Sequence, residues 1–210
     1  LTDLGKDAYV IVPDAYPASM RFLKGCKEIL VYTRYTEFAQ RLMASADLIF
    51  CLDFNEPKRV DLMEPSLTAS LAKKILIDHH LDPVPFCDIT VSHPEISSSC
   101  EVLFRVICSL GLFEQMSLDA ASAIYTGMMT DTGNFTYNSN YPEIYITIAE
   151  LIKKGIDKDW IYGRIHNTNS ENKLRLNGYA LSQRMEVFPE QKAAVITLSQ
   201  EELNRYSYQK

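Results

Sequence analysis

The sequence lacks any apolar run long enough to cross a membrane, and no signal peptide is recognisable. We therefore expect no membrane partner and a cytoplasmic location. It also lacks a basic excess, since 21 Lys and Arg residues against 27 Asp and Glu residues give a net charge of −6. That balance argues against duplex DNA binding. It leaves room for a small phosphorylated ligand, because bound metals can reverse the local field.

Closely paired cysteines are absent as well. The five cysteines are odd in number and show no metal-type or disulfide-type spacing. Cys51 and Cys108 fall inside apolar runs, which favours buried free thiols in a reducing compartment.

Strand-like and helix-like stretches alternate along most of the chain. The predicted strands are 8–12, 29–32, 48–52, 74–77 and 87–91, and the predicted helices are 36–46, 58–72, 99–110, 118–130 and 142–154. Alternation of this kind is typical of crossover units. The fold class expected is α/β, with a mainly parallel sheet and helices on both faces. Ser98, with Glu101 three residues later, predicts a capping box at one helix start.

The pattern changes after residue 168. We predict one domain over 1–168, a linker helix over 169–182 and the start of a smaller second α/β domain over 183–210, opening with a hairpin. The first residues read as a helix end with Gly5 at its C-cap, so we expect a preceding segment outside this sequence.

Acidic and histidine side chains follow three of these elements. Asp78-His79-His80 ends the apolar run 75–77, Asp53 ends the run 48–52, and Asp131 follows the helix 118–130. Each alone also fits an ordinary turn. Together they favour a metal site at the carboxyl edge of a parallel sheet. Two carboxylates with one imidazole (Asp53, His79, Asp131) suit Mn²⁺, with Mg²⁺, Fe²⁺ or Co²⁺ as substitutes.

The order of these motifs resembles the DHH phosphoesterase superfamily, named for the triplet seen here at 78–80. Three further segments carry the resemblance: 48–53, the serine-rich helix start 97–99 with Glu101, and 127–135. The arrangement is most similar to the branch of nano-RNases, pAp phosphatases and cyclic-di-AMP or pApA phosphodiesterases.

The resemblance implies a two-domain enzyme with two Mn²⁺ ions. Asp53 resembles the carboxylate that bridges both metals, and His79 and Asp131 resemble ligands of one. His80 resembles the histidine that contacts the scissile phosphate, and Asp78 the carboxylate that orients the site. Ser98 and Ser99 match a substrate-binding segment.

Two expected motifs do not occur in the sequence. The family's His-x-x-Pro-Asp-x-Asp segment should lie upstream of Leu1, and its glycine-rich substrate motif beyond Lys210, in the second, DHH-associated domain. We therefore expect the 210-residue chain alone to be inactive.

The implied activity is hydrolysis of short oligonucleotides, pAp or (cyclic) dinucleotides by a metal-activated water. Two alternatives remain open: an inorganic pyrophosphatase of the same superfamily, and a non-catalytic nucleotide-binding module. The sequence also leaves open a homodimer.

Overall fold

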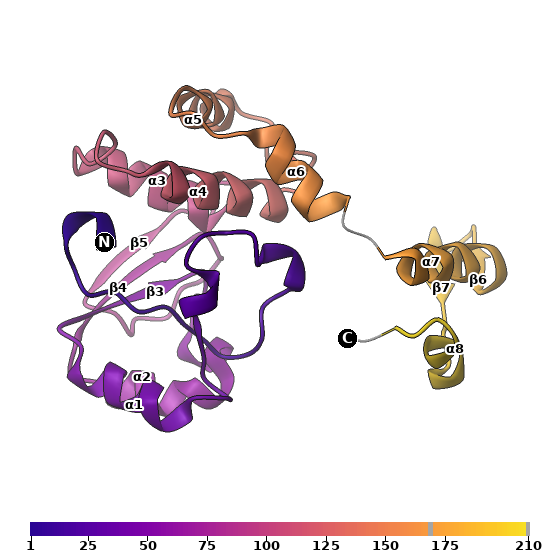
Figure 1. Ribbon diagram of the computed structural model, residues 1–210, viewed down its shortest axis with the longest axis horizontal. Coiled ribbons are helices and arrows are strands. Elements are labelled where there is room, and N and C mark those ends of the chain that lie inside the picture. Colours follow the sequence, from indigo (N-terminus) through magenta and orange to yellow (C-terminus); the bar gives the residue numbers. More distant parts are fainter. Residues whose placement is uncertain (168–169, 209–210) are drawn as a thin grey trace. The chain divides into compact units, whose positions relative to one another are not determined.

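The computed structural model describes residues 1–167 and 170–208, and it divides into two compact units, Leu1–Ile161 and Tyr162–Lys210 (Figure 1). Within the part described, no helix has the length and apolar character needed to cross a membrane. All five cysteines are free; Cys51 is buried as expected, whereas Cys108 is exposed, so the prediction of burial was wrong for Cys108.

Parallel strands form the centre of the first unit. Strands β3 (Leu48–Leu52), β4 (Lys73–Asp78) and β5 (Ile89–Ser92) pair in that order, and all are parallel. Strands β1 (Ile11–Val12) and β2 (Leu30–Val31) form a separate parallel pair. The mixed α/β class with parallel strands is therefore confirmed, although in two sheets rather than one. β1 ends directly before Pro13, because proline has no N–H with which to extend the hydrogen-bonded ladder.

Helices occupy the segments between and after the strands. In the first unit they are η1 (Thr2–Leu4), η2 (Ala18–Met20), η3 (Cys26–Glu28), α1 (Thr36–Ser45), η4 (Pro57–Met63), α2 (Glu64–Ala69), α3 (Ser99–Ser109), α4 (Leu118–Asp131) and α5 (Pro142–Lys153), and α6 (Lys158–His166) crosses the unit boundary. The predicted helix 58–72 is broken into η4 and α2. Asp61 has a positive φ of 47°, and Pro65 cannot donate the N–H of a continuous helix. The sequence analysis missed α6, in which only Ile161 is buried.

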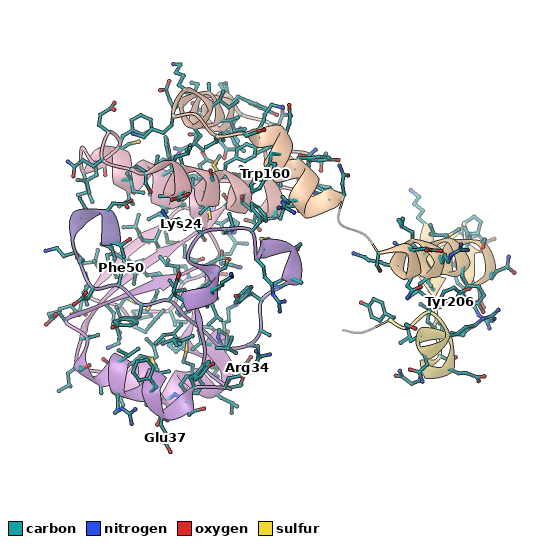
Figure 2. All side chains as sticks on the ribbon, viewed as in Figure 1. Lys24, Arg34, Glu37, Phe50, Trp160 and Tyr206 are labelled. Carbon is teal, nitrogen blue, oxygen red and sulfur yellow. The ribbon has the colours of Figure 1, made fainter. Side chains whose placement is uncertain are left out.

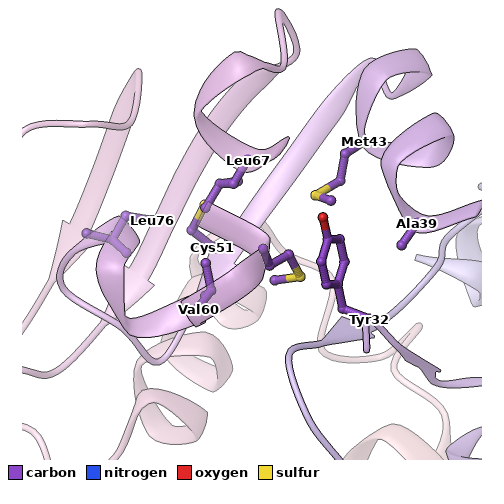
Figure 3. Close-up of a cluster of buried hydrophobic side chains, with 8 residues drawn as sticks. Tyr32, Ala39, Met43, Cys51, Val60, Leu67 and Leu76 are labelled. Carbon is purple, nitrogen blue, oxygen red and sulfur yellow. The ribbon is translucent and has the colours of Figure 1, made fainter. Parts of the chain in front are cut away.

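Both faces of the three-stranded sheet are covered (Figure 1). On one face Cys51 and Leu76 join a cluster with residues of α1, η4 and α2, including Met43, Val60 and Leu67 (Figure 3). Next along β4, Ile77 points to the other face and packs with Ile96 and with Val102 of α3. Successive residues of β4 are thus buried on opposite faces, as expected for a parallel strand between two helical layers.

The N-terminal segment packs on the helical layer. Phe22 makes an edge-to-face ring contact with Trp160 at 5.2 Å, and Lys24 pairs with Asp119 of α4 at 2.5 Å. Figure 2 labels Lys24 and Trp160. Because both partners of the ion pair are largely exposed, the ring contact contributes more to this packing.

The second unit contains α7 (Glu171–Gln183), an antiparallel hairpin of β6 (Met185–Phe188) and β7 (Ala193–Ile196), and α8 (Gln200–Arg205). A capping box between Ser199 and Glu202 begins α8. The interpretation of 169–182 as a linker helix and of 183–210 as the start of a further domain stays a prediction.

Helices α3 and α4 approach each other closely at Gly127. A Cβ at Gly127 would lie 2.1 Å from the Sγ of Cys100. This contact matters for function because α3 begins, and α4 ends, at the residues discussed below.

Replacing Gly127 with alanine should therefore overpack the α3–α4 contact and destabilise the protein by about 1–3 kcal/mol. Gly178→Ala is the matched control, because Gly178 lies inside α7 with nothing within 4 Å of its added Cβ. That control should stabilise by roughly 0.5–1 kcal/mol, the helix preference of alanine over glycine. Urea unfolding of both variants tests the pair, and equal effects of the same sign would contradict the packing argument.

Candidate metal centre

The carboxyl ends of β3 and β4 bring two predicted site segments together. Leu52 pairs with Ile77, and the N–H of Asp53 donates to the carbonyl of Ile77 at 3.2 Å. Asp53 therefore lies beside the Asp78-His79-His80 segment. Its backbone is left-handed, with φ of 66°, a conformation that aspartate tolerates better than most residues. The chain turns away from the sheet there, and the carboxylate remains exposed at the edge.

Asp78 is the buried anchor of this edge. Its side chain is fully buried, and Oδ1 accepts a hydrogen bond from Nδ1 of His80 at 2.7 Å and lies 3.4 Å from Oγ of Ser99. The other carboxylate oxygen is buried without a partner. Because Nδ1 of His80 is held by Asp78, only Nε2 of His80 remains for another ligand.

His79 is oriented by the main chain. Its Nδ1 lies 3.1 Å from the carbonyl oxygen of Ile96, and a carbonyl can only accept, so Nδ1 carries the proton. In the neutral ring, the lone pair of Nε2 then lies 3.2 Å from Oδ2 of Asp131 and 3.8 Å from Oδ1 of Asp53. Ligating histidines in proteins show this arrangement, with the second ring nitrogen donating to a carbonyl.

Asp131 reaches the site as the last residue of α4. Buried Thr132 fixes this helix end: its Oγ1 donates to the Met128 carbonyl at 2.7 Å and accepts from the N–H of Phe135 at 2.9 Å. Burial raises the pKa of Asp131, and the charge of Asp53 raises it further, while His79 opposes the shift. The folded protein therefore holds the ionised form of this carboxylate at a cost.

The donor set fits a divalent cation. Ligand atoms of Asp53, His79 and His80 lie within 4.8 Å of one another, and Oδ2 of Asp131 lies 3.2 Å from Nε2 of His79. Two carboxylates facing an imidazole lone pair repel each other unless a positive charge lies among them, and this mixture of oxygen and nitrogen ligands suits Mn²⁺ and similar ions. The geometry adds His80 to the predicted set. Its role as a substrate contact rather than a ligand stays a prediction.

A cavity of about 290 Å³ opens beside these residues. Its lining consists of Leu52, Asp53, Ser98, Ser99, Cys100, Leu103, Gly127, Thr130 and Asp131. Ser99 Oγ donates to Oδ1 of Asp53 at 2.8 Å, so one serine is tied directly to the centre. Ser98 caps α3 by accepting from the N–H of Glu101 at 3.2 Å. Both serines predicted to contact substrate thus line the cavity; the contact itself stays a prediction.

The predicted capping box is only half formed. The Glu101 carboxylate does not accept from the N–H of the N-cap residue Ser98. It accepts instead from Ser97 Oγ at 2.6 Å, from the Tyr141 hydroxyl at 2.5 Å and from Arg105 at 2.6 Å. Tyr141, which is distant in sequence, was missed because nothing in its own neighbourhood resembles a site. The only signal was Glu101 itself, an acidic residue at a helix position that proved fully buried.

Asp131→Asn should separate metal binding from stability. With chelator, the variant should be more stable than the wild type at neutral pH, because the amide carries no charge and can donate to Nε2 of His79. Because the pKa of Asp131 is raised on folding, its ionised form destabilises the folded protein and its protonated form does not. The difference in unfolding free energy between variant and wild type should therefore shrink as the pH falls through the range in which Asp131 becomes protonated. Mn²⁺ affinity should drop by at least about tenfold. Thermal unfolding from pH 3 to 8 and Mn²⁺ titration measure both effects; a variant less stable than wild type in chelator would contradict the electrostatic argument.

Comparisons with known proteins agree with this geometry. Residues 9–128 match the DHH family, N-terminal domain, a range that contains Asp53, the 78–80 triplet and Glu101 and ends before Asp131. The bifunctional oligoribonuclease and PAP phosphatase NrnA of Thermus thermophilus is 29% identical over 182 residues, covering 87% of this chain and 51% of that protein. The Bacillus subtilis protein of the same name is 26% identical over 173 residues, covering 80% and 53%.

A solved structure is also similar over the whole chain. The crystal structure of an exopolyphosphatase-related protein from Bacteroides fragilis has a TM-score of 0.98 and 53% identity, covering 100% of this chain and 61% of that one. The chain spans about half the length of the curated relatives described above. With more than half of its residues matched by the family's N-terminal domain, and with the triplet at the carboxyl edge of the sheet, the chain belongs to the DHH family of phosphoesterases.

Proposed function

We propose that the intact protein hydrolyses phosphodiester or phosphomonoester bonds in small nucleotides: short oligoribonucleotides, pAp or (cyclic) dinucleotides. The observation that carries this proposal is the cluster of Asp53, His79 and His80, whose ligand atoms lie within 4.8 Å of one another beside an open cavity, with Oδ2 of Asp131 3.2 Å from Nε2 of His79. The names of the two NrnA relatives, which join oligoribonuclease and PAP phosphatase activities, support the substrate class.

In this proposal Asp53, His79 and Asp131 hold Mn²⁺, with Mg²⁺ or Co²⁺ as substitutes. A bound divalent ion supplies Lewis-acid catalysis and lowers the pKa of water at the site. Asp53 has the most exposed carboxylate of the set, and its Oδ1 lies 3.8 Å from Nε2 of His79, so this carboxylate could serve as a ligand. A second ion would need ligands beyond these residues.

The remaining residues act on the substrate. Buried Asp78 holds the ring of His80 at Nδ1, which leaves Nε2 of His80 to contact a phosphate oxygen of the substrate. Ser98 and Ser99 lie at the N-terminus of α3, where main-chain N–H groups favour an anion. The cavity between α3 and α4 would then receive the nucleotide portion.

A phosphoanhydride substrate is the second candidate. The solved structure with 53% identity is described as exopolyphosphatase-related, which favours a substrate such as pyrophosphate or polyphosphate. A non-catalytic nucleotide-binding module is a third alternative, and metal content of the native protein separates it from the two enzymes.

Turnover by the full-length protein tests these alternatives together. Oligoribonucleotides of two to five residues, pAp, pApA and pyrophosphate are assayed with Mn²⁺ and again with chelator. We expect hydrolysis of a nucleotide substrate that is lost in chelator. Equal turnover in both conditions would exclude metal catalysis, and preference for pyrophosphate would favour the second candidate.

Asp53 is proposed as a metal ligand and His80 as a substrate contact, so substitutions at these two residues should reduce bound metal to different extents. Asp53→Asn should reduce bound Mn²⁺ more than His80→Asn does, because the carboxylate contributes charge to the ions whereas His80 is assigned to the substrate. Bound Mn²⁺ is measured for each variant by metal analysis after gel filtration. If His80→Asn loses as much metal as Asp53→Asn, His80 is a ligand and the assignment is wrong.

A further inference from the structure

One peptide group connects the proposed metal ligand His79 to a polar cluster that consists of Tyr141, Glu101 and Arg105. The carbonyl of Ile96 and the N–H of Ser97 belong to the same peptide unit. The carbonyl accepts from Nδ1 of His79 at 3.1 Å, and the N–H donates to the hydroxyl of Tyr141 at 2.9 Å. Both polar ends of this peptide are therefore held, one by the site and one by the cluster.

The cluster continues to a carboxylate that solvent does not reach. The Tyr141 hydroxyl donates to Oε2 of Glu101 at 2.5 Å, and Oε1 of Glu101 accepts from Arg105 at 2.6 Å. Glu101 has no exposed surface, while Arg105 extends partly into solvent. Burial and the hydrogen bond to Glu101 raise the pKa of Tyr141, so its hydroxyl keeps the proton that it donates.

We propose that Tyr141 and Glu101 are positioning residues that fix the ring of His79 through the Ile96–Ser97 peptide, and thereby set the affinity of the metal site. This inference rests on the proposed function of His79 as a ligand. It assigns a role in that site to a residue 62 positions away in sequence, beyond the range matched by the family's N-terminal domain.

The physical argument concerns orientation and polarisation. A peptide whose N–H lacked its partner could rotate to find another, and its carbonyl would move away from His79. Hydrogen bonds in series also polarise one another, so the anionic end at Glu101 makes the Ile96 carbonyl a better acceptor and Nε2 of His79 a better donor of electrons. Outer partners of metal-ligating histidines typically contribute about 10–100-fold to metal affinity.

The cluster offers its own matched control. Tyr141 and Ser97 each donate a hydroxyl hydrogen bond to Oε2 of Glu101, but only the Tyr141 hydroxyl also accepts from the peptide that contacts His79. Tyr141→Phe and Ser97→Ala therefore remove comparable bonds from Glu101, and only the first interrupts the series that reaches the site. Tyr145→Phe, at an exposed position in α5, controls for loss of a tyrosine hydroxyl.

The experiment measures Mn²⁺ affinity of the full-length protein by titration calorimetry. Tyr141→Phe should weaken Mn²⁺ binding by about tenfold or more, whereas Ser97→Ala and Tyr145→Phe should keep the wild-type affinity. Equal losses in Tyr141→Phe and Ser97→Ala, or no loss in either, would overturn the proposal. If His79→Ala loses Mn²⁺ and Tyr141→Phe does not, this inference alone fails. If His79→Ala binds Mn²⁺ normally, the proposed function of His79 fails, and the inference with it.

A second measurement needs no metal, and its first result needs no variant. Long-range ¹H–¹⁵N correlation spectra of the labelled, chelator-treated wild type report which nitrogen of each histidine carries the proton. His79 should be the Nδ1–H form, because its Nδ1 partner is a carbonyl. Its ring nitrogen signals should shift in Tyr141→Phe and remain unchanged in Ser97→Ala. An Nε2–H form in the wild type would overturn the proposed connection even if Tyr141→Phe failed to fold.

Discussion

The site depends on the parallel pairing of β3 with β4. That pairing ends with the hydrogen bond from Asp53 N–H to the Ile77 carbonyl, which lies one residue before Asp78. A slip of one residue would exchange the faces of β4 and move Leu76 and Ile77 out of their clusters. The buried side chains on both faces therefore specify the register, and the register places Asp53 beside the histidines. The packing of the apolar core thus determines where the candidate metal ligands Asp53 and His79 lie.

The carboxylates at this edge of the sheet destabilise the free protein and would favour binding of a cation. Asp53 and Asp131 face the same imidazole nitrogen, and burial disfavours the ionised form of Asp131. Asp78 is fully buried with one unpartnered oxygen. Buried and crowded carboxylates cost free energy unless a cation compensates them. The surrounding sheet and helices tolerate that cost because they are packed on both faces of β4.

Sequence reasoning succeeded where one local rule decides the outcome. Polar residues directly after apolar strands mark the carboxyl edge, which is why Asp53 and the triplet could be placed before the structure was known, and the resemblance to the DHH family is confirmed. Sequence reasoning failed where a contact between residues far apart in the sequence decides the structure. Glu101 has the spacing of a capping box, yet its carboxylate bonds to Tyr141 because that hydroxyl arrives from a loop 40 residues away. The positive φ of Asp61 and the largely exposed helix α6 carry weak local signals.

The residues of the site come from two kinds of element, strand ends and helices, and different contacts hold each kind in place. Strand ends supply Asp53, Asp78, His79 and His80, whose spacing is fixed by main-chain hydrogen bonds of the sheet. Helices supply Asp131 and the serines, and their positions depend on the α3–α4 contact at Gly127, where no side chain larger than hydrogen fits. A small change in helix packing would therefore alter the cavity and Asp131 while leaving the strand-borne residues in register. The two parts of the site are therefore held by different contacts: the register of β3 and β4 holds the strand-borne residues, and the packing of α3 on α4 holds Asp131 and the serines.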